Sequence, residues 1–123
     1  FALLGHLIEI CKGSKTNGTI HFDKLPLIPG AIELAKNGFV TGASERNWSG
    51  YGHDVIMDAK LGAVHRNLLT DPQTSGGLLV ACDPTIVEEV LQIFSDEGFA
   101  HATVIGEFNT ISSEGAKVRV IQD

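Results

Sequence analysis

The sequence has few cysteines and no long apolar run, and both absences narrow the class of protein. Its 123 residues include two cysteines, Cys11 and Cys82, which lie far apart and form no Cys-x-x-Cys pair. We therefore predict two small buried thiols in a reducing cytoplasm, with a disulfide between them as the less favoured alternative. No apolar run approaches the ~20 residues that cross a bilayer, and no segment resembles a secretory signal, so we expect no membrane contact.

Positive charge is also scarce. Lys and Arg number 9 against 15 Asp and Glu, which gives a formal net charge of −6. A surface that binds nucleic acid usually carries clustered Lys and Arg, so the composition argues against a nucleic-acid partner. The overall composition, with 43% hydrophobic and 20% charged residues, is typical of one folded globular domain.

Patterns for metal binding and nucleophilic catalysis are missing as well. The five histidines are His6, His21, His53, His65 and His101. None has a second His or Cys at the i+2 or i+4 spacing of metal ligands. No Gly-x-Ser-x-Gly elbow marks a nucleophilic serine. We therefore assign no catalytic residue and no metal ligand to this chain.

Hydrophobic periodicity predicts an α+β domain, in which helices pack against a mixed β-sheet. Helices are expected over residues 1–11, 30–37 and 83–97, and strands over residues 19–23, 77–82, 102–108 and 118–121. Residues 55–69 suit a helix or two short pieces. Polar, glycine-rich composition predicts loops over residues 12–18 and 39–51.

Two of these predictions have specific reasons. The helix at 83–97 has Asp83 as its N-cap, Pro84 at its first position and Gly98 just beyond its end. The run at 77–82 is apolar without alternation, so we predict a central strand that is buried on both faces.

The stretch at residues 70–79 is the least explained by composition. It reads Thr-Asp-Pro-Gln-Thr-Ser-Gly-Gly-Leu-Leu, a tight polar turn that leads into an apolar run. Consecutive N–H groups of Ser75, Gly76 and Gly77 would form an anion-binding nest. However, no helix follows and no P-loop Lys is present. The alternative, which the residues alone favour, is a structural turn in which Asp71 and Thr74 cap backbone donors.

A second candidate segment, residues 45–52, places Arg46 beside Trp48 and Tyr51. An Arg next to exposed aromatic rings would contact an anionic ligand or a partner. In the other interpretation the two rings fold back on the domain. The sequence leaves both open.

The string Asp-Pro-Gln-Thr-Ser-Gly-Gly at residues 71–77, here called the signature loop, resembles the signature of the C-terminal domain of selenophosphate synthetases (selenide, water dikinases). These enzymes belong to the aminoimidazole ribonucleotide synthetase superfamily. Residues 1–7 resemble the end of the family's Asp-Val-Thr-Gly-Phe-Gly-Leu-Leu-Gly-His-Leu motif, with Ala2 in place of a Gly. Residues 25–31, the pair at 46–47 and residues 105–107 also resemble family segments, in the family's order.

The resemblance implies the fold of the C-terminal domain of aminoimidazole ribonucleotide synthetase-like enzymes. It also implies an activity, the synthesis of selenophosphate from selenide and ATP with release of AMP and phosphate, by a cytoplasmic homodimer that needs Mg²⁺. The family's nucleophilic Cys or selenocysteine, its Lys and most of its ATP- and Mg²⁺-binding acids belong to an N-terminal domain. We therefore expect residues 1–123 to be the C-terminal domain of a longer enzyme, without activity or cofactor by itself. The start at Phe1, inside a helical pattern and without Met, is interpreted in the same way.

Two groups of residues are candidates to face the nucleotide cleft and to contact the chain's own N-terminal domain. The first is Gly5 and His6. The second lies in the signature loop: Asp71, Gln73, Thr74, Ser75, Gly76 and Gly77. Two alternatives for the function remain. One is the C-terminal domain of another superfamily enzyme, such as aminoimidazole ribonucleotide synthetase, thiamine-monophosphate kinase or a hydrogenase maturation factor. The other is a stand-alone, non-catalytic binding or assembly module.

Overall fold

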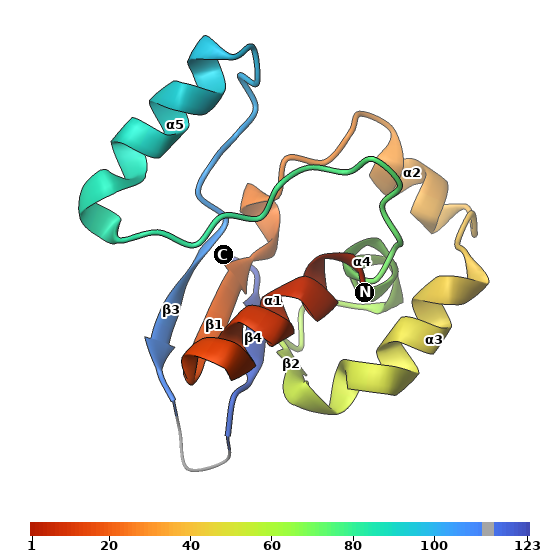
Figure 1. Ribbon diagram of the computed structural model, residues 1–123. Helices are drawn as coiled ribbons and strands as arrows, with labels where there is room; N and C mark the ends of the chain where they lie inside the picture. The colour runs from red at the N-terminus through yellow and green to blue at the C-terminus, as the bar shows by residue number, and fades with distance from the viewer. Residues whose placement is uncertain (112–114) are drawn as a thin grey trace.

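A computed structural model describes residues 1–111 and 115–123. Figure 1 shows a sheet with helices around it, and η denotes a short 3-10 helix. In chain order the elements are α1 (Ala2–Ser14), β1 (Thr16–His21), η1 (Phe22–Lys24), α2 (Ala31–Lys36), α3 (Gly42–Tyr51), η2 (Gly52–Asp54), β2 (Val55–Met57), α4 (Ala63–Leu69), η3 (Pro84–Ile86), α5 (Val87–Asp96), β3 (Gly106–Thr110) and β4 (Val118–Ile121).

The four strands form one mixed sheet in the order β2-β4-β1-β3. β1 pairs in parallel with β4 and antiparallel with β3, and β2 pairs in parallel with β4. α1 lies across one face of this sheet and packs on β1 and β4. The predicted α+β class, a mixed sheet with helices packed against it, is therefore confirmed.

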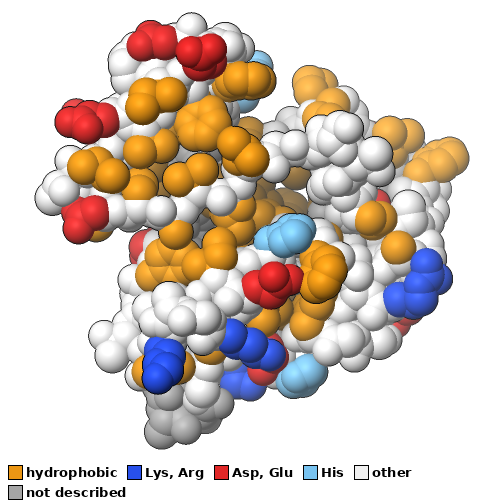
Figure 2. All heavy atoms as spheres, viewed as in Figure 1, with side chains coloured by type: hydrophobic (Ala, Val, Ile, Leu, Met, Phe, Trp, Pro, Cys, Tyr) orange, Lys and Arg blue, Asp and Glu red, His pale blue; other side chains and the backbone are white. Residues whose placement is uncertain are grey.

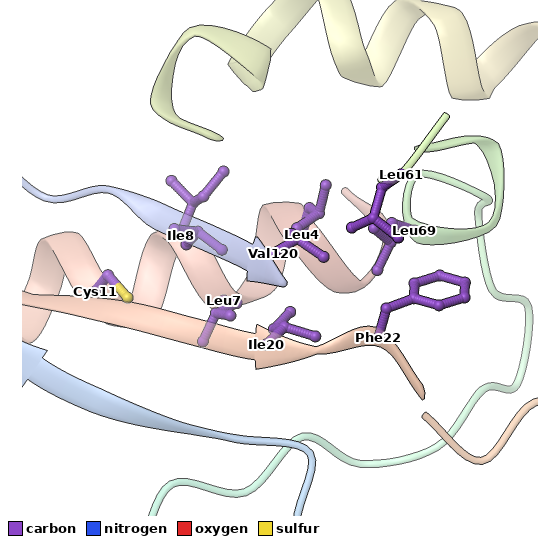
Figure 3. Packing of buried hydrophobic residues seen from close by; sticks show 10 residues of the cluster. Leu4, Leu7, Ile8, Cys11, Ile20, Phe22, Leu61, Leu69 and Val120 are labelled. Carbon is purple, nitrogen blue, oxygen red and sulfur yellow. The ribbon is translucent and has the colours of Figure 1, made fainter. Parts of the chain in front are cut away.

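The core lies between α1 and the sheet (Figure 3). Its helical members repeat at helical spacing and its strand members alternate, as expected for elements with one buried side. It consists of Leu4, Leu7, Ile8, Cys11, Ile20, Phe22, Leu61, Leu69, Val118 and Val120. Both cysteines are free thiols. The prediction of a buried thiol holds for Cys11, which is 1% exposed, whereas Cys82 is only half-buried.

The two predicted loops are wrong. α1 continues to Ser14, and a single left-handed residue, Lys15, joins it to β1. Residues 42–51 form helix α3, whose N-cap Thr41 accepts a hydrogen bond from the Ser44 N–H at 3.3 Å. Gly and Ser lower the helix propensity of this segment, so its helix depends on that cap and on packing against the rest of the domain.

Residues 55–69 divide into the strand β2 and the helix α4, so of the two alternatives left open, a helix or two short pieces, the second is confirmed. The helix expected at 30–37 is also present, as α2, with Gly30 as its N-cap and Gly38 in a left-handed conformation just after it.

The central strand predicted at residues 77–82 is absent. Leu78 is 80% exposed and Val80 is 47% exposed, and neither belongs to a strand. A uniform apolar run shows only that a segment is apolar, because it does not specify the partner to which its backbone hydrogen-bonds. The strand expected at 102–108 likewise begins only at Gly106, as β3.

The helix predicted at 83–97 is present as η3 followed by α5, and Asp83 caps it by accepting from the Thr85 N–H at 2.8 Å. Its apolar stripe does not enter the core, however: none of the residues of α5 is buried, and Ile93 is 64% exposed. Figure 2 shows hydrophobic side chains gathered over this part of the surface, with acidic side chains around them. Among the described residues, no helix combines the length and apolar character needed to span a membrane.

Candidate functional site

The residue just before the signature loop, Thr70, is held in place by hydrogen bonds. α4 ends at Leu69, and the next residue, Thr70, is fully buried. The backbone N–H and the Oγ1 hydroxyl of Thr70 both donate to the Arg66 carbonyl, at 3.0 and 2.8 Å. The carbonyl of Thr70 in turn accepts a hydrogen bond from Asn47 Nδ2 of α3, at 2.9 Å. The N–H, the hydroxyl and the carbonyl of Thr70 are thus all hydrogen-bonded just before the loop begins.

Beyond Thr70 the loop is open to solvent. Asp71 is half-buried, and residues 72–77 are exposed. Gln73 Nε2 donates to the Asp71 carbonyl at 3.2 Å and to Asp71 Oδ2 at 3.0 Å. Ser75 adopts a left-handed conformation with φ of 53°. The described hydrogen bonds of Asp71 come from a side chain and not from a backbone donor, so the cap predicted for Asp71 is wrong.

The other predicted group, Gly5 and His6, lies on the second turn of α1. The Tyr51 hydroxyl of α3 donates to the Phe1 carbonyl at 2.6 Å. A Cβ at Gly5 would lie 2.9 Å from Cε2 of Tyr51, so this close approach requires glycine. Burial raises the pKa of Tyr51 to about 12, which keeps the phenol protonated as a donor. The His6 ring is exposed and stacks on Phe1 at 5.5 Å.

Gly5 and Thr70, the residue just before the signature loop, both contact side chains of α3. α1 packs on α3 and on α4. Leu4, next to Gly5, and Leu69, next to Thr70, belong to the same buried cluster and lie near one another in Figure 3. The first turns of α1 and Thr70, here called the root of the signature loop, therefore contact the same helix, α3, and the same buried cluster.

The aromatic side chains of the second candidate segment fold back on the domain. Trp48 and Tyr51 are half-buried and pack against the core. The Arg66 guanidinium lies 5.2 Å from the Trp48 ring centroid and 3.7 Å from the Glu45 carboxylate. Of the two interpretations, the one in which the rings pack on the domain holds for these contacts. Arg46 is exposed, and its contact with an anion stays a prediction.

The supporting residues Ser44 and Asn47 were missed by the sequence analysis, because residues 39–51 were expected to form a loop, and the role of Thr70 was missed because its partner Asn47 lies in that segment. A signal was available, since Ser44, Asn47, Trp48 and Tyr51 follow one another at i, i+3, i+4 and i+7. Two of the four are polar, and the pattern therefore does not resemble an apolar stripe.

Two hollows adjoin these elements. The smaller, about 160 Å³, lies between α2 and α4 and has Phe39, Leu68 and Asp71 among its lining residues. The larger, about 660 Å³, is lined mainly by apolar side chains, and its lining also includes Asp23, Lys36 and His65. Neither lining gathers the several cationic groups with which proteins usually neutralise phosphates.

A charged cluster at the C-terminal end of α1 is structural. Asp54 Oδ2 lies 2.9 Å from Lys12 Nζ, and its Oδ1 lies 3.2 Å from Lys117 Nζ. Burial by itself raises the pKa of Asp54, but the two ammonium groups outweigh it and hold the pKa below its usual value. In residues 1–111 and 115–123, no three His, Cys, Asp or Glu side chains come together in the manner of a metal site.

Comparison with known proteins identifies the family. Residues 1–119 match the family described as "AIR synthase related protein, C-terminal domain". The chain is 51% identical over 107 residues to the selenide, water dikinase of Dechloromonas aromatica (strain RCB), which covers 87% of this chain and 31% of that protein. It is 49% identical over 121 residues to the selenide, water dikinase of Paraburkholderia xenovorans (strain LB400), with 98% of this chain and 33% of that protein covered.

A more distant relative, the selenide, water dikinase of Rhizobium meliloti (strain 1021), is 40% identical over 121 residues, which cover 98% of this chain and 34% of that protein. The chain thus spans about a third of the length of the curated relatives it matches. The resemblance inferred from the signature loop is confirmed, and the chain belongs to the family of the C-terminal domains of AIR synthase related proteins.

Proposed function

We propose that this chain is the C-terminal domain of a selenide, water dikinase, an enzyme that makes selenophosphate from selenide and ATP and releases AMP and phosphate. The observation that carries the proposal is the identity of about half of all aligned residues to proteins of that name, over 87–98% of the chain. The proposed enzyme acts in the cytoplasm as a homodimer.

In this proposal the reacting groups lie on the N-terminal domain of the same protein. Phosphoryl transfer depends on positioning and on neutralising charge with metal ions and basic groups. The side chains around the signature loop supply little positive charge: Asp71 is acidic, and the rest of the loop is uncharged. Their contribution is therefore a wall of the nucleotide cleft, made by Gly5, His6 and the signature loop, with the loop's backbone N–H groups facing the anionic substrate.

Mg²⁺ accompanies ATP in the proposed reaction. The ion prefers oxygen ligands in octahedral geometry, usually one or two carboxylates together with substrate phosphates. Asp71 is the one carboxylate in the signature loop, and its Oδ2 already accepts from Gln73. The signature loop therefore does not fit a Mg²⁺ site by itself, and no three His, Cys, Asp or Glu side chains elsewhere among residues 1–111 and 115–123 gather in the manner of a metal site.

Two measurements test the proposal. Full-length enzyme with ATP and selenide should form selenophosphate, detected by ³¹P NMR, and should release AMP only when selenide is present. Turnover of the substrates of aminoimidazole ribonucleotide synthetase or of thiamine-monophosphate kinase, without selenide dependence, would assign the chain to another enzyme of the superfamily.

The second measurement concerns the division between domains. Calorimetric titration of the 123-residue chain with ATP and Mg²⁺ should give no measurable heat of binding, whereas the full-length enzyme should bind. Tight binding by the 123-residue chain would contradict the assignment of the reacting groups to the N-terminal domain.

A further inference from the structure

The side chains of α3 satisfy carbonyls at the C-terminal end of α4. The last four carbonyls of an α-helix have no partner within the helix. Ser44 Oγ donates to the Asn67 carbonyl at 3.5 Å, and Asn47 Nδ2 donates to the Thr70 carbonyl at 2.9 Å. One polar side of α3 thus closes the end of α4.

The two hydrogen bonds hold different parts of the chain. The Asn67 carbonyl lies inside α4, so the bond from Ser44 joins helix to helix. The Thr70 carbonyl is the last backbone group before Asp71, so the bond from Asn47 fixes the root of the signature loop. The loop's own side-chain bond, from Gln73 to Asp71, is internal and fixes its shape but not its place.

We propose that Asn47 is a positioning residue that sets where the signature loop stands relative to the nucleotide. The inference rests on the proposed function, since it assumes that the loop walls the ATP cleft. A displacement at the Thr70 carbonyl is carried to Ser75, Gly76 and Gly77, because the described side-chain hydrogen bonds of the loop are internal and do not hold it to the rest of the domain. In catalysis a misplacement of about 1 Å can cost about 100-fold in rate, so the root of such a loop is a sensitive point.

The chemistry of the contact makes a sharp variant available. Asn47→Asp keeps the shape of the side chain but replaces its NH₂ donor with a carboxylate oxygen, which faces the Thr70 carbonyl without a proton to share. Asn47→Ala removes the side chain without adding repulsion. The matched control is Ser44→Ala, which removes the neighbouring bond of the same helix pair but leaves the bond to Thr70 in place.

The experiment combines hydrogen exchange with steady-state kinetics of the full-length enzyme. The Thr70 N–H, buried and hydrogen-bonded to the Arg66 carbonyl just before the loop, reports whether the loop is held, and its exchange is here called loop exchange. We expect Asn47→Asp to speed loop exchange at least tenfold and to raise KM for ATP about tenfold, with a smaller change in kcat. Asn47→Ala should have the same effects to a lesser degree. Ser44→Ala should leave loop exchange and KM within twofold of wild type, even if it lowers thermal stability as much as the Asn47 variants do. Unchanged exchange in the α1 core shows that each variant is folded.

Loop exchange that does not change in Asn47→Asp would overturn the positioning role, whatever the kinetics. Faster loop exchange with an unchanged KM would overturn the connection to the nucleotide. Failure of the proposed function would differ from both, because the wild-type enzyme would then form no selenophosphate while loop exchange would still report on Asn47.

Discussion

The two adjacent glycines of the signature loop have different surroundings, so the same substitution should have opposite effects at the two positions. A Cβ at Gly76 would lie 2.7 Å from the Cβ of Gln73, whereas a Cβ at Gly77 would meet nothing within 4 Å. Neither glycine is among those with a positive φ, so the backbone accepts alanine at both positions. The difference between Gly76→Ala and Gly77→Ala is therefore a matter of space alone.

The size of the effect at Gly76 follows from the contact. Ordinary van der Waals contact begins at 3.4 Å, so Gln73 must move by at least 0.7 Å (3.4 less 2.7) to admit the new methyl group. The bond from Gln73 Nε2 to Asp71 Oδ2, now 3.0 Å, does not survive a shift of that size along its length. A lost hydrogen bond costs about 0.5–1.5 kcal/mol, and alanine returns part of this by restricting the unfolded chain, so we expect Gly76→Ala to destabilise the chain by a net of up to about 1 kcal/mol.

At Gly77 the expected change in stability has the opposite sign. Alanine restricts the unfolded chain more than glycine does, and at a compatible site this stabilises a protein by about 0.4–1 kcal/mol. Urea unfolding, followed by the fluorescence of Trp48, the single tryptophan, measures both variants against wild type. If Gly77→Ala were destabilised as much as Gly76→Ala, the loop geometry described above would be wrong. A loss of enzyme activity in Gly77→Ala without a loss of stability would instead indicate that a ligand or another domain approaches its backbone.

Three further predictions concern the framework of the domain. A Cβ at Gly106 would collide with the Thr19 carbonyl oxygen across the β1–β3 pair, so Gly106→Ala should lower the free energy of unfolding by about 3 kcal/mol. Gly13 lies at an open position in α1, so Gly13→Ala should instead raise the free energy of unfolding by about 0.5–1 kcal/mol. The reverse order of the urea midpoints of these two variants would contradict this reasoning. Because the pKa of Asp54 is lowered in the folded chain, its stabilisation should be complete above about pH 4 and vanish as the pH falls through the folded pKa. Asp54→Asn should thus be less stable than wild type at pH 7 by about 1–2 kcal/mol, and the difference should shrink as the pH falls through the folded pKa of Asp54. A difference that stays constant on acidification would refute the argument. Tyr51 is the single tyrosine, so the absorbance change at alkaline pH reports it alone, and its midpoint should lie near pH 12 in the folded chain; a midpoint near 10 would show that its hydroxyl is not buried.

The elements that could be predicted from the sequence are those whose stability is visible locally. α1 has apolar residues at helical spacing, and the helix around α5 has an Asp83 cap followed by Pro84. β4 alternates buried and exposed residues. In each case the residues that form the element also carry its signal, so the pattern suffices.

The placement of the apolar run at 77–82 could not be predicted in this way. Whether a strand forms depends on which edge of the sheet is free and near, and the sheet here has β3 beside β1 at one end and β2 at the other. That information belongs to the whole fold. For the same reason, the exposure of the apolar stripe on α5 could not be read from its periodicity, which specifies a face but not what covers it.

The candidate site could also be predicted only in part. Residues 71–77 are recognised by their order alone, but the atom that fixes the loop is contributed by Asn47, 23 positions before the Thr70 that it holds. A buried amide or hydroxyl needs a partner, and the end of a helix has carbonyls that need donors. α3 and α4 meet both needs at once, which explains why the inward side of α3 carries Ser44 and Asn47 as well as aromatic residues. A helix whose task is to close the end of another helix is therefore polar where most helices are apolar, and a search for apolar stripes classifies it as a loop.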